Sequence, residues 1–497
     1  MSQTFNLSGE AVGTIPDTQP ATNPEIALNT PHRPFTYGLP PEVLGEIFFR
    51  SLPAHPMVHR QPDVTVAPML LCHVCSYWRA VAVGMQQLWE NLFYSLSVYP
   101  PGPAKNLSLD QNIRPDDLKF LRWWRRKLGN KSVNLRFVVR WFKDYPEDWG
   151  EKGDTESFMR LILSARSLDV DKGFACALRM HLGTGFLSST SKTSTFFLRE
   201  GSGGFRGVLR NFPQDIPFGP RLTPFSTTHP VRRIFLEAMT IKERNVAEIQ
   251  WTHLTHAILM NVAISTQAWF LVTGECVHLE SAIFHIQGCT EPGHVGDAPN
   301  RTLPRLRRLV VKWDPSEFKQ PIFQNLYLPA LTGLRLHSCL SINELHQLLK
   351  STPSVKELHL SYRIPADPDH YSKRGLLPSP GSGIDPILSC IPALEHLVLQ
   401  INPFWNKEYR EIDNLVDILG TTPWLELGRR GNPIKRVELT AEYWEWMKKM
   451  IEGAEKFRNH IEGVNIVIRD DSPWGRDEQL HGQYVDFGFD DLSFVLG

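Results

Sequence analysis

Two cysteines and a histidine are the residues whose spacing most directly suggests chemistry. Cys72, His73 and Cys75 lie in a Cys-His-Val-Cys run, which has the spacing of zinc ligands and of thioredoxin-like redox pairs. A structural zinc site needs four ligands, usually as two close pairs, and no second pair lies nearby. Both cysteines also fall within a predicted apolar helix, where an unpaired cysteine packs as a small hydrophobic residue. We therefore predict core packing here and no metal site.

A carboxylate–imidazole group is the second candidate. Asp367, Asp369 and His370 lie together beside Pro365 and Pro368, and such a pair could act as general acid and base. Acidic residues flanked by prolines more often form turns, so we assign them no catalytic role. The glycine-rich run 200–207 lacks the Lys-Ser/Thr of a phosphate-binding loop and is predicted to be a surface loop.

Five histidines recur at similar places in the repeat described below: His256, His285, His337, His359 and His396. A metal site would require three or four of them to converge with a carboxylate. A hydrolase that uses these histidines is the weakest hypothesis, because no nucleophile and base can be paired from spacing. We expect a protein that is not an enzyme and that needs no cofactor.

Charge and composition exclude several classes of partner. The chain of 497 residues has 53 Lys and Arg against 53 Asp and Glu, so no net field favours nucleic acid or an anionic membrane. The cations of 122–127 are interpreted as the solvated side of a helix at 116–128. We find no secretory signal and no apolar run long enough to span a bilayer. The seven scattered cysteines do not suggest a disulfide framework. A cytoplasmic or nuclear location, or both, is expected.

The segment 39–93 is predicted to form a small helical unit. Leu-Pro-Pro-Glu at 39–42 suits a helix start, since proline fits the first helical positions. Apolar residues then recur at helical spacing in 43–48, and a second apolar helix is predicted at 69–83. Two such short helices bury too little surface by themselves, so they need further structure or a partner.

This segment resembles the F-box of fungal proteins, in which LPxEhLxxIF is followed by a VCxxWRxhA helix and a Leu-Trp pair. The resemblance covers about a tenth of the chain, and it departs from the pattern at Met85-Gln86-Gln87, where a Ser/Thr-Pro pair is usual. It implies docking to the Skp-type adaptor of a cullin–RING (SCF-type) ubiquitin ligase. The residues that we expect to form or support the adaptor-binding surface are Leu39, Pro40, Pro41, Leu44, Ile47, Phe48, Val74, Trp78 and Trp89.

A divergent repeat follows the helical unit. An apolar-x-x-apolar-x-apolar frame starts at Val231, Leu254, Leu279, Leu306, Leu331, Val355, Leu394 and Ile434. The first five intervals are 23, 25, 27, 25 and 24 residues, within the window of leucine-rich repeats, and the last two, 39 and 40, exceed it. Helices at 342–349 and 413–419 separate successive strands. The expected fold class is α/β, a helical F-box followed by a divergent leucine-rich-repeat-like solenoid with a parallel sheet.

We divide the chain into five regions: a disordered lead (1–35), the F-box (36–93), a linker or cap with strands at 92–99 and 133–139 (94–225), the solenoid (226–470) and a tail (471–497). Between the apolar positions of each frame, the remaining side chains should line a concave face that binds a target protein. The residues predicted there are Arg233, His256, His285, Arg308, Lys312, Arg335, His337, Glu357, His359 and His396.

The expected function is that of a substrate-recognition subunit, with the F-box bound to the adaptor and the repeats bound to an unknown target. The alternative is a protein-interaction scaffold that uses the repeats but is not recruited to a ligase. Exposure of the apolar stripe at 39–48 favours docking, whereas burial of that stripe against 92–140 favours the scaffold.

Overall fold

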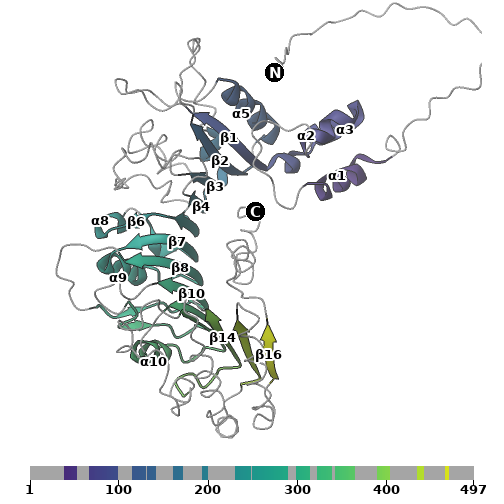
Figure 1. Ribbon diagram of the computed structural model, residues 1–497. Coiled ribbons are helices and arrows are strands. Elements are labelled where there is room, and N and C mark those ends of the chain that lie inside the picture. Colours follow the sequence, from purple (N-terminus) through teal and green to yellow (C-terminus); the bar gives the residue numbers. More distant parts are fainter. Residues whose placement is uncertain are drawn as a thin grey trace, which may run out of the picture.

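The computed structural model is a mixed α/β structure built on one large parallel sheet. Figure 1 shows its strands following one another from β1 to β16, with short helices at the amino-terminal end. The structure describes residues 39–52, 67–98, 115–129, 131–141, 160–171, 193–199, 230–247, 249–288, 298–313, 322–338, 342–363, 389–402, 434–441 and 465–469. The lead at 1–35 and the predicted helix at 413–419 lie outside these residues.

The amino-terminal helices are α1 (Pro41–Arg50), α2 (Met69–Val74), α3 (Ser76–Gly84) and the 3-10 helix η2 (Gln86–Trp89). The prediction of one continuous helix over 69–83 was wrong, because the chain is extended at Cys75, with φ −159° and ψ 172°. The backbone N–H of Trp78 donates to Cys75 Sγ at 3.4 Å. Cys75 therefore caps the start of α3 instead of continuing α2.

The large sheet contains strands from almost the whole described chain. In sequence, its strands are β1 (Asn91–Val98), β2 (Val133–Trp141), β3 (Ala165–Asp171), β4 (Thr195–Arg199), β5 (Arg233–Glu237), β6 (Thr240–Ile241), β7 (His256–Ile264), β8 (Ser281–Gly288), β10 (Arg308–Trp313), β12 (Gly333–Ser338), β13 (Glu357–Arg363), β14 (His396–Asn402), β15 (Arg436–Ala441) and β16 (Asn465–Arg469). Spatial order equals sequence order, except that the short β6 also pairs with β7. This agrees with the predicted parallel α/β arrangement.

The register places the apolar positions of all eight predicted frames in aligned rows. For example, Leu309 lies opposite Ala282 on one side and Leu334 on the other, and Leu334 lies opposite Leu358. Because side chains alternate along a strand, these rows share one face, and those of their residues whose side chains are described belong to the main hydrophobic core. The repeat pattern thus predicted both the strands and the face that they bury.

Helices cover this core face. They include α5 (Pro115–Leu128), α8 (Glu243–Val246), α9 (Thr266–Glu275) and α10 (Ile342–Lys350), with η5 (Trp251–His253) and a small sheet of β9 (Arg301–Thr302) and β11 (Leu326–Tyr327). Trp269 of α9 meets Phe284 of β8 edge-on, with ring centroids 5.2 Å apart. The predicted helices at 116–128 and 342–349 are confirmed within one residue of their ends.

Strands β3, β4 and β16 were not predicted. Strands β1 to β4 also join the same sheet as the repeats, although residues 94–225 were predicted to form a separate linker or cap. Three long stretches without described residues, 142–159, 172–192 and 200–229, separate β2, β3, β4 and β5.

Trp89 connects the helices to the sheet. Its side chain is 0% exposed, and its indole Nε1 donates to the Ala82 carbonyl of α3 at 2.9 Å. The Trp124 Nε1 of α5 donates to the Trp89 carbonyl at 2.8 Å, and the two indole rings pack edge-on with centroids 5.0 Å apart. One residue therefore joins α3, α5 and the start of β1.

We predict that Trp89→Ala lowers the free energy of unfolding by about 3–5 kcal/mol, because it leaves a large cavity in the core and removes the donor to Ala82. Urea denaturation followed by tryptophan fluorescence and circular dichroism measures this change. Leu70→Ala is the control, since Leu70 is 42% exposed, and its cost should stay within about 0.5 kcal/mol. Equal effects of the two substitutions would contradict this role for Trp89.

Candidate interaction surfaces

Helix α1 has one buried and one exposed apolar side. Leu44 and Phe48 are each 0% exposed, whereas Val43 is 47% and Ile47 is 44% exposed. The two residues of each pair are four positions apart, so each pair lies on one side of the helix. The apolar stripe predicted at 39–48 therefore divides into a packing side and an open side.

The packing side of α1 is held closely against α3 and the segment before η2. The rings of Phe48 and Trp78 lie 4.9 Å apart between centroids, and Tyr77 Oη donates to the Leu39 carbonyl at 2.8 Å. Gly45 faces Met85 so closely that a Cβ at Gly45 would lie 2.7 Å from Met85 Sδ. These contacts fix which side of α1 faces outward.

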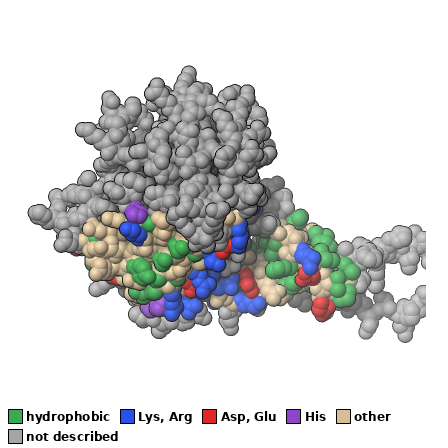
Figure 2. All heavy atoms as spheres, turned by 90° about the horizontal axis from the view of Figure 1, so that it is seen from below, with side chains coloured by type: hydrophobic (Ala, Val, Ile, Leu, Met, Phe, Trp, Pro, Cys, Tyr) green, Lys and Arg blue, Asp and Glu red, His purple; other side chains and the backbone are tan. Residues whose placement is uncertain are grey.

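Helix α2 adds further exposed apolar side chains. Leu70 is 42%, Val74 is 52% and Phe49, at the end of α1, is 53% exposed. Among the described residues, five of the seven exposed large hydrophobic side chains lie in α1 and α2. Figure 2 shows hydrophobic side chains gathered at the right, where Figure 1 places these helices. We call Val43, Ile47, Phe49, Leu70 and Val74 the helical patch.

The residues predicted for adaptor binding divide in the same way. Pro40, Pro41, Ile47 and Val74 are exposed, and Leu39 and Trp78 are partly buried. Leu44, Phe48 and Trp89 are wholly buried, so of the two roles expected for them, forming or supporting the surface, only support is open to them. Val43, Phe49 and Leu70 were omitted from the predicted surface. Helical spacing alone marks an apolar stripe without showing which side of it a neighbouring helix covers.

The Cys-His-Val-Cys run lies across the break between α2 and α3. Cys72 is 7% exposed, and burial raises the pKa of its thiol, which opposes the thiolate form needed for metal binding or redox exchange. Both Cys72 and Cys75 are free thiols. Across the described part of the chain, no group of three or more His, Cys, Asp or Glu side chains could hold a metal ion.

The face of the sheet opposite the core carries the predicted target-binding residues; we call it the strip face. Its central row is apolar and buried: Phe197, Phe235, Ile258, Ile283 and Val310 are 1%, 4%, 0%, 2% and 3% exposed. These residues lie directly opposite one another on β4, β5, β7, β8 and β10. Of this row, Phe235, Ile258, Ile283 and Val310 were expected to lie on the open concave face, and they are buried instead.

Burial also corrects part of the predicted histidine strip. His285 and His359 are only 4% and 2% exposed, and the side chain of His337 lies outside the described ones. In the register, His359 lies opposite Arg335 and His285 opposite Lys312. These histidines therefore have a cationic neighbour on the adjacent strand, which disfavours the convergence of imidazoles that metal binding or a histidine-based hydrolase would require.

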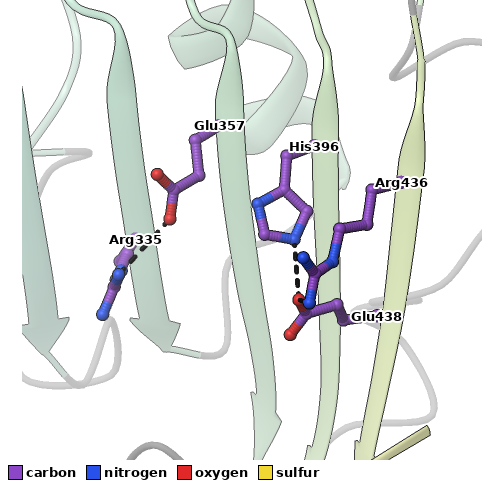
Figure 3. A network of polar contacts seen from close by, with 5 residues as sticks. All are labelled: Arg335, Glu357, His396, Arg436 and Glu438. Atoms are coloured by element: carbon purple, nitrogen blue, oxygen red, sulfur yellow. Dashed lines mark hydrogen bonds and ion pairs between the residues drawn. The ribbon is translucent and has the colours of Figure 1, made fainter. Parts of the chain in front are cut away.

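Opposite charges pair across neighbouring strands further along the strip face. Arg335 Nη2 lies 3.3 Å from Glu357 Oε1, and His396 Nε2 lies 3.2 Å from Glu438 Oε1. Arg436 also pairs with Glu438, so that one carboxylate, on a side chain only 8% exposed, faces two basic groups (Figure 3). At the other end of the sheet, Arg136 Nε lies 3.3 Å from Asp169 Oδ2. These ionisable groups therefore face one another within the sheet.

The accessible part of the strip is the row where the strands begin. Arg308 and Lys312 are exposed. Five further residues predicted for target binding are partly exposed: Arg233, His256, Arg335, Glu357 and His396. Except for Lys312 and Arg335, these residues are the first of their strands. A partner that contacts the strip would therefore meet the strand-start edge before the apolar centre.

No family model and no curated protein matches the chain. These surfaces are therefore interpreted from the chemistry of their own side chains. Within the described ranges, every helix is too short or too polar to cross a membrane.

We predict that two substitutions one turn apart on α1 behave differently. Ile47→Asp should change the free energy of unfolding by less than about 0.5 kcal/mol, because Ile47 is 44% exposed. Leu44→Asp places an unpaired carboxylate at a position that is 0% exposed, so it should destabilise the helices by more than about 3 kcal/mol. Chemical denaturation and limited proteolysis measure the difference. Similar stability of the two variants would show that α1 packs on another side.

Proposed function

We propose that this chain is the substrate-recognition subunit of a cullin–RING ubiquitin ligase. In this proposal, α1 to α3 form an F-box that docks onto a Skp-type adaptor, and the large sheet is a leucine-rich-repeat-like solenoid that binds a target protein. The observation that carries the proposal is the helical patch, which coincides with the segment that resembles an F-box.

The helical patch has the character of a docking surface. Its five side chains are 42–53% exposed, and covering each of them would contribute about 1 kcal/mol, roughly half the value for complete burial. Several large exposed apolar side chains on one small helical unit are typical of an interaction site. Here the core behind the patch is already complete, since Leu44, Phe48 and Trp89 are wholly buried. The partner would thus bind a preformed surface.

The sheet would hold the target near the ligase. A subunit of this kind makes and breaks no bond; it raises the effective concentration of target lysines beside the ubiquitin-loaded enzyme. The accessible strand-start row, which includes Arg233, Arg308 and Glu357, offers charged groups for recognition.

A scaffold that is not recruited to a ligase is the second candidate. It is favoured by the burial of Leu44 and Phe48 within the chain itself, since the apolar stripe does not depend on a partner for its core. The two candidates differ in whether the helical patch binds the adaptor.

We predict that the double substitution Ile47→Asp and Val74→Asp weakens binding of the chain to a Skp-type adaptor at least tenfold, because it places two charges in the apolar contact. Pull-down with purified adaptor, followed by titration in a binding assay, measures the loss. Circular dichroism should remain unchanged, since both side chains are exposed.

The matched control is Val277→Asp with Tyr327→Asp. These are the two exposed large hydrophobic side chains of the described chain outside α1 and α2, 39% and 45% exposed. This control should retain full adaptor binding. If the Ile47/Val74 variant binds the adaptor as well as the wild type does, the ligase proposal fails and the scaffold remains.

A further inference from the structure

A single row of residues runs along the edge where the strands begin; we call it the edge row. Each residue lies just before a strand, apart from Arg166, which is the second residue of β3. From Ser194 onward, each backbone N–H donates to the carbonyl of the preceding member at 2.8–2.9 Å. Its members are Arg166, Ser194, Arg232, Thr255, Glu280, Arg307, Thr332, Lys356, Glu395 and Lys435.

The edge row contains no apolar side chain, and cations predominate in it. Five of its members are Arg or Lys and two are Glu, and all five cations are exposed. Its hydroxyl residues bond locally: Thr255 Oγ1 donates to the Arg232 carbonyl at 3.1 Å, and Thr332 Oγ1 to the Arg307 carbonyl at 3.0 Å. The longer cationic side chains project from this hydrogen-bonded backbone.

The next residue along three of the strands adds more positive charge. The residues that directly follow the edge-row positions form a second row. It includes Arg233, Arg308 and Arg436, and its acidic residue is Glu357. The two rows together have eight cations and three carboxylates, although the whole chain has 53 charged residues of each sign. Figure 2 shows Lys and Arg side chains gathered with a few acidic ones on one face of the molecule. The two rows thus carry a local excess of positive charge.

The spacing of the cations suits an extended acidic chain. Arg307, Lys356 and Lys435 occupy every second position of the edge row, so their backbones are about 10 Å apart at about 4.8 Å per strand. A polyproline II chain brings every third residue back to the same side after about 9 Å. We propose that the edge row binds an extended protein segment with acidic side chains at every third position, seated on Arg307, Lys356 and Lys435.

Without a partner, the carboxylate of Glu395 forms ion pairs with two lysines of the edge row. Its carboxylate lies 3.3 Å from Lys356 Nζ and 2.7 Å from Lys435 Nζ, and hydrogen bonds from Lys435 and then Lys356 lower the pKa of Glu395. Exposed ion pairs of this kind are weak, so a segment with several carboxylates can replace them. Glu395 thereby competes with the acidic partner for the same two cations.

A nucleic acid suits this edge less well than an acidic protein segment. Glu280 and Glu395 interrupt the row and would repel a phosphate backbone, which carries a charge on every nucleotide. An acidic segment with a charge at every third residue can place its neutral residues opposite these glutamates. The inference does not depend on ligase recruitment, because it concerns the sheet and not the helical patch.

The test measures binding of fluorescein-labelled peptides to the full chain by fluorescence anisotropy at low salt. One peptide has glutamate at every third position, and a second has the same composition with its glutamates contiguous. We expect the first peptide to bind at least fivefold more tightly than the second. The triple substitution Arg307→Glu, Lys356→Glu and Lys435→Glu should weaken binding of the first peptide at least tenfold, and raised salt should do the same by screening.

The matched control is Glu395→Gln, which keeps the side chain's size and removes the competing charge. It should bind the spaced peptide more tightly than the wild type does, by about two- to fivefold. The inference is overturned if the triple variant binds normally, if Glu395→Gln weakens binding, or if the contiguous peptide or a single-stranded oligonucleotide of equal charge binds as tightly. None of these outcomes alters adaptor binding, so failure here is distinguishable from failure of the proposed function.

Discussion

The indole of Trp89 lies where the amino-terminal helices meet the sheet, and the arrangement of both depends on it. Its hydrogen bond to Ala82 fixes the end of α3, and the bond from Trp124 to its carbonyl fixes α5. Because α1 packs on α3 through Phe48 and Trp78, the orientation of α1 follows from the same junction. The side of α1 that remains open, with Val43 and Ile47, is thus determined by buried contacts.

The sheet is organised by a second constraint, the strict alternation of side chains along strands held in parallel register. One face supplies the core, with aligned leucines such as Leu334 and Leu358. The other face has a buried apolar centre around Ile258 and Ile283 and charged residues at the strand starts. The charged strand-start residues lie outside this buried centre and are exposed or partly exposed, so charge can accumulate there without disturbing the core.

The sequence was informative where a pattern corresponds to one physical cause. The apolar frames from Val231 to Ile434 predicted eight strands and their core face, because burial requires the same positions in each repeat. Exposure was harder to predict, because strand alternation assigns a side chain to a face without showing whether that face is covered. His285 and His359 are polar yet buried, as are Ile258 and Ile283 of the same face. The break at Cys75 was also missed, because the apolar spacing continues through it while the backbone does not. Strands β3 and β4 lacked a regular interval to mark them.

The central claim is that α1 and α2 present a preformed surface to a partner while the sheet remains available. Hydrogen–deuterium exchange of the full chain, with and without a purified Skp-type adaptor, tests this most directly. The account predicts slower exchange on binding in peptides that cover residues 41–52 and 69–84, with exchange in β8, β10 and β12 unchanged. Unchanged exchange in both helical segments at saturating adaptor would contradict it.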